Sequence, residues 1–419
     1  IWNTLEGFKV KPYYRAEDIE TLKYLNTNPG EAPYLRGNES TKNNWEIRQD
    51  IESEDLAAAN QKAVDALKKG ADAVGLNMKN VKNIGDLNVL FNNIDITKSK
   101  IYITSSISYK QIVNLLIEYI KINSIEKNNV NGALNFDPWS YALKHGNFYN
   151  SFEENISEAF DLINLCKNEL PNFKIITVNG NLFHNSGSSI IQELAFTLAS
   201  ANEYVYQLTK KGLSIDDISP RIMFSFGIGS NFFMEIAKIR AARLLWSKIV
   251  EQYKPLSEKS MKIFIHCVSS LWNKTIFDSY VNMLRTTTEA TSAAIAGADS
   301  ITVLPFDLPF RNSDEFSDRI ARNQQIILKE ETYLDKIVDP SAGSYYIENL
   351  TDSIAHYSWE LFKKVEEKGG FFASITENFV QEEINKIAQI RFDEYATRKT
   401  TILGTNQYPN LSETMLDKV

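Results

Sequence analysis

Hydrophobic and polar positions follow two alternating patterns along most of the chain. Short runs rich in β-branched and other apolar residues recur, and between them apolar residues lie three and four positions apart. The short runs predict eight strands, at 45–49, 73–77, 101–105, 131–135, 174–179, 221–226, 262–267 and 299–304. The intervening stretches predict helices, among them 54–69, 109–121, 152–169, 187–210, 231–251 and 283–296. No hairpin signal joins successive strands, so the pattern favours parallel strands connected by helical crossovers.

Eight strand–helix units are the number that closes a (β/α)₈, or TIM, barrel, and we expect this α/β fold over residues 45–314. An open doubly wound sheet is the alternative, but it suits fewer strands and no G-x-G-x-x-G follows the first strand. Residues 1–44 contain several prolines and no sustained period, which indicates an extended N-terminal arm. Residues 315–401 predict a helical extension packed on the barrel, and 402–419 a tail or linker.

Composition narrows the function classes. The 419 residues are 43% hydrophobic and 23% charged, as in an ordinary globular protein with a large core. The net charge of −8 and the scattered Lys and Arg residues argue against nucleic-acid binding. No apolar stretch is long enough to cross a membrane. Cys166 and Cys267 are too few for a disulfide framework, so we expect a reducing, cytoplasmic location.

In a barrel of this type, chemistry resides at the carboxyl ends of the strands. The four histidines, at 145, 184, 266 and 356, share no ligand spacing, so no metal site is expected. Asp50 and Asp137 could form an acid–base pair, but capping or solvated carboxylates are the favoured interpretation. Cys267 is expected to be inert core, because no base adjoins it.

The stretch at 221–246 combines a buried strand, a Gly-x-Gly turn and a long amphipathic helix. Gly227 and Gly229 could cradle a phosphate with their backbone N–H groups, or simply allow a tight turn, and both interpretations stay open. Alternation predicts that His266 packs between strand and helix. Arg240 and Arg243 are expected to flank the helix rather than to bind a ligand.

Eight ordered segments together carry a family resemblance. They are EGFKVKPYY (6–14), PGEAPYLRG (29–37), WEIRQ (45–49), QELAFTLASANEY (192–204), the 221–246 stretch, RTTTEATSAAIAGADSITV (285–303), ARNQQIILKEE (321–331) and VDPSAGSYYIENLT (338–351). Across nearly its whole length the chain resembles the adenosylcobalamin-dependent methylmalonyl-CoA mutases, most closely their small, or β, non-catalytic subunit.

The resemblance implies a coenzyme-A-binding barrel in a heterodimer of catalytic and non-catalytic chains. Catalytic members carry a further C-terminal cobalamin domain with an Asp-x-His-x-x-Gly motif, which these 419 residues lack. We therefore expect no cobalamin-binding domain and no cofactor bound by this chain. Adenosylcobalamin is expected in the partner, the large or α subunit.

Departures from the family pattern fall where catalytic members hold the substrate. Where the family has a tyrosine after the first strand, a glutamine after the fourth, an arginine further on, a histidine after the fifth strand and a glutamine after the seventh, this chain has Asp50, Asn135, His145, Leu182 and Val268. No catalytic residue is therefore expected. His184, two positions after Leu182, leaves the alignment there open to a small shift. Arg221 is retained and is expected as a vestige of substrate binding.

The barrel axis bears on the same question. Catalytic members resemble one another in lining the axis with small polar side chains, through which the pantetheine arm threads. Alternation here predicts a filled axis, made by Ile101, Ile103, Ile175, Met223 and Ile265. Each such buried side chain contributes roughly 1.5–3 kcal/mol to folding, so a filled barrel would be stable without ligand.

The resemblance and its departures predict a non-catalytic small subunit of a heterodimeric methylmalonyl-CoA mutase of propionate metabolism. Its large subunit would interconvert (R)-methylmalonyl-CoA and succinyl-CoA, and the arm of residues 1–44 would contact that partner. One alternative is a catalytic acyl-CoA mutase barrel of altered substrate range that uses a cobalamin domain on another chain. A third hypothesis is an independent coenzyme A sensor.

Overall fold

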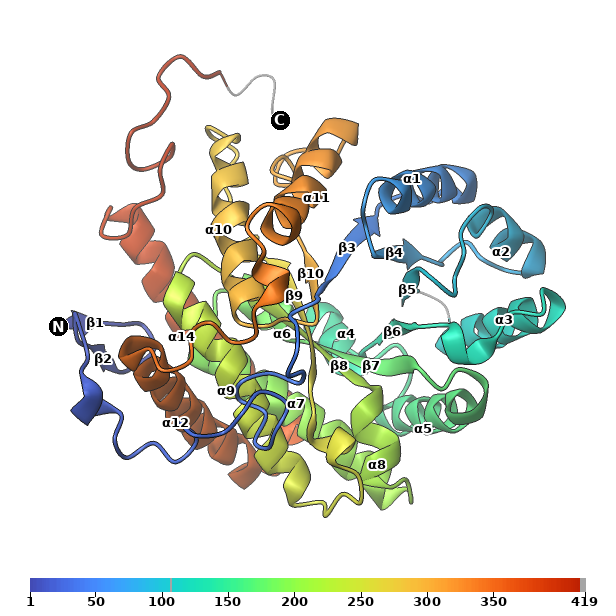
Figure 1. The fold of residues 1–419 in the computed structure, drawn as a ribbon, viewed down its shortest axis with the longest axis horizontal. Helices are drawn as coiled ribbons and strands as arrows, with labels where there is room; N and C mark the ends of the chain where they lie inside the picture. The colour runs from blue at the N-terminus through green and yellow to red at the C-terminus, as the bar shows by residue number, and fades with distance from the viewer. Residues whose placement is uncertain (106–107, 415–419) are drawn as a thin grey trace.

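The computed structural model describes residues 1–105 and 108–414, and its centre is a closed barrel of eight parallel strands (Figure 1). Each strand pairs with the next along the chain, and the last returns to the first. The strands are β3 (Glu46–Ile51), β4 (Ala73–Asn77), β5 (Lys100–Thr104), β6 (Gly132–Phe136), β7 (Phe173–Asn179), β8 (Ile222–Ile228), β9 (Phe264–Ser269) and β10 (Ser300–Thr302). All eight predicted strands and the closed barrel are confirmed.

Helices follow the strands and cover the outside of the barrel. They are α1 (Leu56–Lys68), α2 (Ile84–Leu90), α3 (Tyr109–Ile122), α4 (Pro138–His145), α5 (Phe152–Glu169), α6 (Gly180–Asn185), α7 (Ile190–Lys210), α8 (Ile215–Ile218), α9 (Phe232–Glu251), α10 (Val281–Ile295) and α11 (Glu315–Glu330). The six predicted helices all form. Their starts follow local capping: the Asp55 side chain accepts from Ala58 N, and Ser151 and Ser189 open capping boxes.

The C-terminal extension begins later than expected. α11 follows β10 and packs against β3 and α10, so it is the eighth helix of the barrel and lies beyond the boundary expected at residue 314. The extension proper is α12 (Tyr345–Glu367), α13 (Phe371–Thr376) and α14 (Phe379–Ala396). α12 lies along α7 and α9 (Figure 1), and buried Arg240 of α9 pairs with Asp339 and Glu348. No helix among the described residues is long and apolar enough to cross a bilayer.

The arm lies on the extension of its own chain. It begins with a small antiparallel pair, β1 (Trp2–Asn3) and β2 (Lys9–Val10). The Phe8 ring stacks on Tyr357 of α12, with centroids 5.4 Å apart, and the Tyr24 hydroxyl donates to the Glu348 carbonyl. Apolar contacts and scattered hydrogen bonds therefore hold the arm.

The tail also has partners, in the part that the structure describes. The Thr405 and Thr275 hydroxyls are 2.8 Å apart, and Arg285 of α10 donates to the Leu403 carbonyl. Residues 415–419 of the expected tail lie outside the described residues.

Contacts across the barrel show which side chains point inward. Tyr102 on β5 lies under the Arg48 guanidinium of β3, 4.2 Å from Cζ to the ring centroid, and faces the His266 ring of β9. These strands are not neighbours in the barrel, so the contacts cross its interior. His266 therefore points inward, and its expected place between strand and helix is wrong.

The predicted filling of the axis is wrong for four of its five residues. Met223 does point inward, but the isoleucines belong to the outer core shared with the helices: Ile101, Ile103, Ile175 and Ile265. The phase error has a physical cause: parallel strands are buried on both faces, so their apolar runs do not mark which face is inner.

The interior is nevertheless filled at one level, by different residues. Ala73, Tyr102, Ala133 and Met223 form a separate buried cluster, against which Phe264 packs. The Tyr102 hydroxyl donates to Glu46 Oε2 at 2.5 Å. The filling is thus a mixed aromatic and polar layer instead of an aliphatic one.

Candidate functional site

The carboxyl ends of the strands open into a polar hollow. It consists of two adjoining cavities, of about 860 and 290 Å³, which we call the outer and inner parts of the mouth cavity. Six polar side chains border both parts: Asn77, Thr104, Asn135, Asn179, Asn181 and Asn185. The inner part reaches down to Arg48, Tyr102 and His266. This is the face on which a barrel of this class carries its function.

All five substituted positions line this hollow. Asp50 and Val268 border the inner part, His145 and Leu182 the outer part, and Asn135 both. The structure therefore brings together residues that are spread over 200 positions of sequence, and what they do there stays a prediction. Asn135 is held by Asn179, whose Nδ2 donates to its Oδ1 at 3.1 Å.

Asp50 does not present a free negative charge. Its Oδ1 accepts from Arg48 Nε at 2.6 Å, and its carboxylate lies over Gly75, where any Cβ would clash with it. Arg48 was missed in the sequence, although residues two apart on a strand share a face and the spacing was a usable signal.

Asp137 is a structural carboxylate. It accepts from the Ser140 hydroxyl at 2.5 Å, the Asn179 amide at 3.0 Å and the Tyr204 hydroxyl at 2.8 Å. Burial raises the pKa of Asp137 despite these donors. Because the side chain caps α4 and is buried, the capping interpretation is confirmed and no acid–base pair with Asp50 forms.

A buried charged network joins β8 to the helices behind it. Lys238 Nζ lies 2.7 Å from Glu193 Oε2 and 2.6 Å from Glu235 Oε2, and it also donates to the Gly227 carbonyl. Burial alone would lower the pKa of Lys238, but the two carboxylates raise it above its usual value. We call His184, Glu193, Gly227, Glu235 and Lys238 the β8–α9 network.

The Gly-x-Gly turn belongs to this network. The Gly227 amide donates to Glu193 at 2.8 Å and the Gly229 amide to Glu235 at 2.9 Å. A Cβ at Gly227 would lie 2.5 Å from His184 Cγ. Carboxylates of the chain itself thus occupy the amides that a phosphate would need, and the glycines allow a close approach of side chains.

His184 sits between a serine and a carboxylate, an order found in acyl-transfer triads. Its Nε2 is 2.8 Å from Ser270 Oγ and its Nδ1 is 3.3 Å from Glu193 Oε2. However, Ser270 is 1% exposed and borders neither part of the mouth cavity, and Lys238 shares the Glu193 oxygen. A substrate cannot reach this serine, so the contact is structural.

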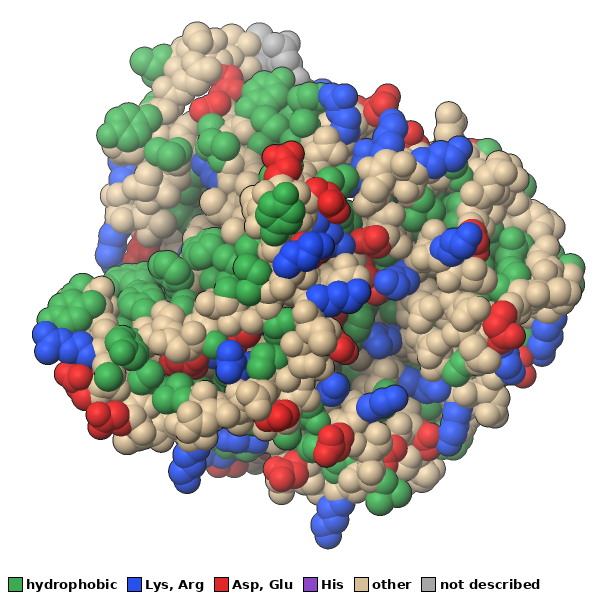
Figure 2. All heavy atoms as spheres, viewed as in Figure 1, with side chains coloured by type: hydrophobic (Ala, Val, Ile, Leu, Met, Phe, Trp, Pro, Cys, Tyr) green, Lys and Arg blue, Asp and Glu red, His purple; other side chains and the backbone are tan. Residues whose placement is uncertain are grey.

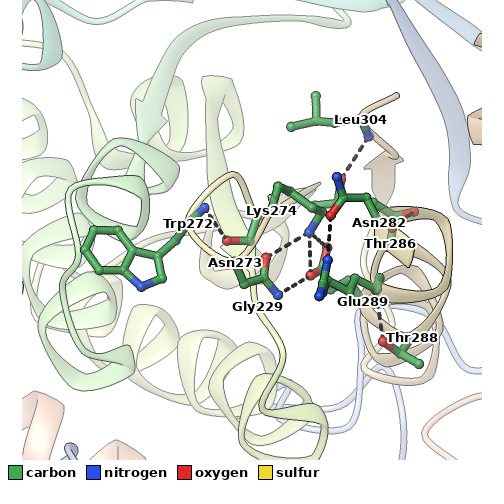
Figure 3. A network of polar contacts seen from close by, with 12 residues as sticks. Gly229, Trp272, Asn273, Lys274, Asn282, Thr286, Thr288, Glu289 and Leu304 are labelled. Atoms are coloured by element: carbon green, nitrogen blue, oxygen red, sulfur yellow. Dashed lines mark hydrogen bonds and ion pairs between the residues drawn. The ribbon is translucent and has the colours of Figure 1, made fainter. Parts of the chain in front are cut away.

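A second buried pair fixes the loop after β9. Figure 3 shows Asn273 and Lys274 converging on Glu289 of α10, with Lys274 Nζ 2.7 and 2.8 Å from the two carboxylate oxygens. Burial lowers the pKa of Lys274 and raises that of Glu289. This pair positions the loop whose Leu271 borders the inner mouth cavity. No local sequence pattern predicted the pair.

The amino-acid sequence matches a known protein family over nearly its whole length. The family model described as methylmalonyl-CoA mutase matches residues 3–85 and 73–419. The chain belongs to the methylmalonyl-CoA mutase family.

Relatives in this family carry different names. The chain is 44% identical over 428 residues to the methylmalonyl-CoA mutase small subunit of Porphyromonas gingivalis, covering 100% of this chain and 68% of that protein. It is 32% identical over 443 residues to the methylmalonyl-CoA mutase of Rhizobium meliloti, with coverages of 100% and 62%. It is 31% identical over 420 residues to the methylmalonyl-CoA mutase small subunit of Streptomyces virginiae, with coverages of 99% and 67%. The chain thus spans about two thirds of the length of these relatives.

The retained Arg221 of the mutase family resemblance does not reach the mouth. It immediately precedes β8, at the amino end of the barrel, and its Nη1 donates to the Phe173 carbonyl at 3.2 Å. Burial lowers the pKa of Arg221, and its electrostatic partners are Cys166 of α5 and Asp217 of α8. These contacts place the side chain between β7, α5 and α8. Its expected role as a vestige of substrate binding stays a prediction.

The two cysteines of this mutase family member are unsuited to nucleophilic chemistry. Both are buried, and burial raises the pKa of Cys166 to about 12 and that of Cys267 further above its usual value. Within residues 1–105 and 108–414, no group of three or more His, Cys, Asp or Glu side chains could hold a metal ion.

Proposed function

We propose that this chain is the non-catalytic small subunit of a heterodimeric, adenosylcobalamin-dependent methylmalonyl-CoA mutase. The observation that carries the proposal is the state of the mouth cavity, where the five substituted positions leave no guanidinium or tyrosine at the expected carboxylate-holding sites. Arg48 offers the cavity a guanidinium, but it is paired with Asp50 of the same strand. Two relatives named as small subunits, at 44% and 31% identity, support the same assignment.

The filled level of the barrel gives independent support. A pantetheine arm would have to pass the buried cluster of Tyr102, Met223 and Phe264. The contacts of Tyr102 with Arg48 above and Glu46 below fix its ring across the interior. Moving it aside would break a hydrogen bond to a charged group, which costs about 1.5–3 kcal/mol.

The residues of this chain do not fit a corrin ring. Only residues 78–83 connect β4 to α2 at the mouth. Catalytic members resemble one another in placing a longer corrin-facing loop there. We therefore assign the cobalamin, and with it the interconversion of (R)-methylmalonyl-CoA and succinyl-CoA, to the partner large subunit.

In this proposal the chain acts by binding its partner. Figure 2 shows hydrophobic side chains gathered over the arm and α12, at the left of the view. Large exposed apolar side chains in these elements and at the start of α9 include Trp2, Tyr13, Phe233, Tyr345 and Tyr357. Extended apolar surface of this kind marks a protein interface, so we assign the large-subunit contact to this face.

The runner-up is a catalytic acyl-CoA mutase barrel that borrows a cobalamin domain from another chain. One observation favours it: the outer mouth cavity remains open, at about 860 Å³, and is lined by hydroxyls and amides. A cavity of that size can enclose a small ligand.

Reconstitution separates the two functions. The chain, a candidate large subunit and the mixture are each assayed for conversion of methylmalonyl-CoA in the presence of adenosylcobalamin. We expect no turnover and no coenzyme A ester binding by this chain alone, and full activity only in the co-purified complex. Turnover by this chain supplied with a free cobalamin domain would establish the runner-up and refute our proposal.

A further inference from the structure

A separate cavity, of about 210 Å³, lies between the arm and α14, away from the mouth cavity. Glu6 of the arm enters it, together with Glu235 at the start of α9 and Arg391 and Glu394 of α14. The amino end of α7 also opens here, because Ser189 and Ile190 border the cavity. We call this space the arm cavity.

Glu6 is the polar attachment of the arm in this cavity. Its Oε2 accepts from the Ile191 amide, in the first turn of α7, at 3.0 Å. A helix amino end favours such an acceptor, because its first N–H groups have no partner within the helix.

The charged groups around Glu6 are already engaged elsewhere. Glu235 is bonded to Lys238 and the Gly229 amide, and His184 to Ser270 and Glu193. Arg391 donates to the Ser188 carbonyl and lies over the Trp272 ring, while Glu394 pairs with Lys399. Tyr395 completes the titratable groups of the cavity. Among the described residues, no Lys or Arg forms an ion pair with Glu6.

A carboxylate in this position is poorly compensated. It is partly withdrawn from water, its donors are the Ile191 amide and the Ser189 side chain, and it faces the second carboxylate of Glu235. Its neutral form is therefore favoured. Burial first, and then Glu235, raise the pKa of Glu6 from 4.5 to about 7, although the Ile191 amide, Arg391 and the Ser189 side chain oppose the shift.

We propose that Glu6 is a pH-sensitive latch: its neutral form keeps the arm docked on α7, and its ionised form releases the arm. A released Glu6 in water ionises at its ordinary value of 4.5. Docking is therefore strongest below that pH, weakens as the pH rises towards about 7, and changes no further above it. The latch is a property of the isolated chain. If the arm also contacts the large subunit, as proposed above, binding of the large subunit should depend on pH in the same range.

Hydrogen exchange of the full chain tests the latch. The Glu6→Gln variant keeps a carbonyl that accepts from Ile191 but cannot ionise. At each pH the exchange of arm residues 1–14 is compared between the two proteins, so that the intrinsic pH dependence of exchange cancels. We expect nearly equal exchange at pH 4, below the ordinary pKa of Glu6, and about tenfold faster exchange of the unmodified chain at pH 8. The tenfold value is below the full linkage because Glu6 keeps some contact with water.

Two further variants complete the design. Glu6→Ala, which removes the acceptor, should expose the arm at every pH, and Glu20→Gln, at an exposed arm position, should behave as the unmodified chain. Equal exchange of the unmodified chain and Glu6→Gln at pH 8 would overturn the latch, as would an arm that stays protected in Glu6→Ala. Neither result would bear on the small-subunit assignment, since no partner is present in the assay.

Discussion

The mouth cavity and the β8–α9 network hold the same types of side chain in opposite circumstances. In the network, Lys238, Glu193 and Glu235 are buried, and Lys238 contacts a carboxylate of α7, a carboxylate of α9 and the Gly227 carbonyl of β8. At the mouth, Lys144 and His145 are exposed on α4, where the ring of His145 meets only its neighbour Tyr141 among the described contacts. The charged groups of the network are thus paired and buried, whereas Lys144 and His145 at the mouth are exposed and make few contacts.

This difference predicts that the network determines the stability of the fold and that the mouth determines only ligand binding. A buried charge that loses its partner is strongly destabilising, whereas an exposed one contributes little. Substitutions in the network should therefore change stability, and substitutions at the mouth should change only what the mouth binds. A catalytic mouth would break this division, because its side chains would affect the reaction rate.

The largest effect is expected for Lys238→Met. The substitution leaves Glu193 and Glu235 buried without a cation, and we expect a loss of about 3–5 kcal/mol in the free energy of unfolding, measured by chemical denaturation. Lys259→Met, at an exposed lysine, is the control and should change stability by less than about 0.5 kcal/mol. A loss below about 1 kcal/mol for Lys238→Met would show that the network adds nothing to cohesion.

Gly227→Ala tests the packing role of the turn. Its Cβ would meet the His184 ring at 2.5 Å, so we expect a destabilisation of about 1–3 kcal/mol from overpacking. In a chain that already carries His184→Ala, the obstructing ring is gone. There Gly227→Ala should lower the free energy of unfolding by less than it does in the unmodified chain. Strictly additive effects would mean that the two residues do not compete for space.

His266→Asn addresses the barrel interior through pH. Burial, and then the positive charge of Arg48, lower the pKa of His266 well below its usual value. The unfolded chain therefore binds a proton that the folded chain excludes, and stability falls as the pH drops below about 6.5. Below that pH, we expect the free energy of unfolding of the unmodified chain to fall by up to about 1.4 kcal/mol more per pH unit than that of the variant.

The control for this measurement is His356→Asn, at an exposed histidine of α12. It should retain the pH slope of the unmodified chain. Parallel slopes for the unmodified chain and His266→Asn would place His266 in contact with water rather than in the barrel interior.

His266 also shows where sequence-based prediction fails for this fold. The eight strands were predictable because their apolar runs recur between helical stretches. That Asp50 and Val268 border one cavity followed from the common end of parallel strands. The inward side of each strand was not predictable. In Ile101–Tyr102–Ile103 every residue is buried, so neither face is marked by polarity, and the tyrosine proved to be the inner residue.

Tertiary pairing explains the other omissions. Lys274 and Glu289 meet across a loop of irregular conformation, and Arg240 meets Glu348 over 108 positions. Spacing within one helix or strand carries no information about such pairs. Arg48 and Asp50, by contrast, share one strand face and could have been paired in advance.

The smallest effect is expected at the mouth, for His145→Ala. The side chain is exposed at the rim of the outer cavity, so we expect a change in unfolding free energy of less than about 0.5 kcal/mol. The rate of methylmalonyl-CoA conversion by the reconstituted complex should also be unchanged, because the family arginine that would hold the substrate carboxylate is absent at this position. Tyr141→Ala, which removes the ring beside His145, is the matched control and should leave both the unfolding free energy and the conversion rate unchanged. A tenfold or greater fall in rate with unaltered stability would assign the mouth to catalysis, and the division between a cohesive network and an inert mouth would then be wrong.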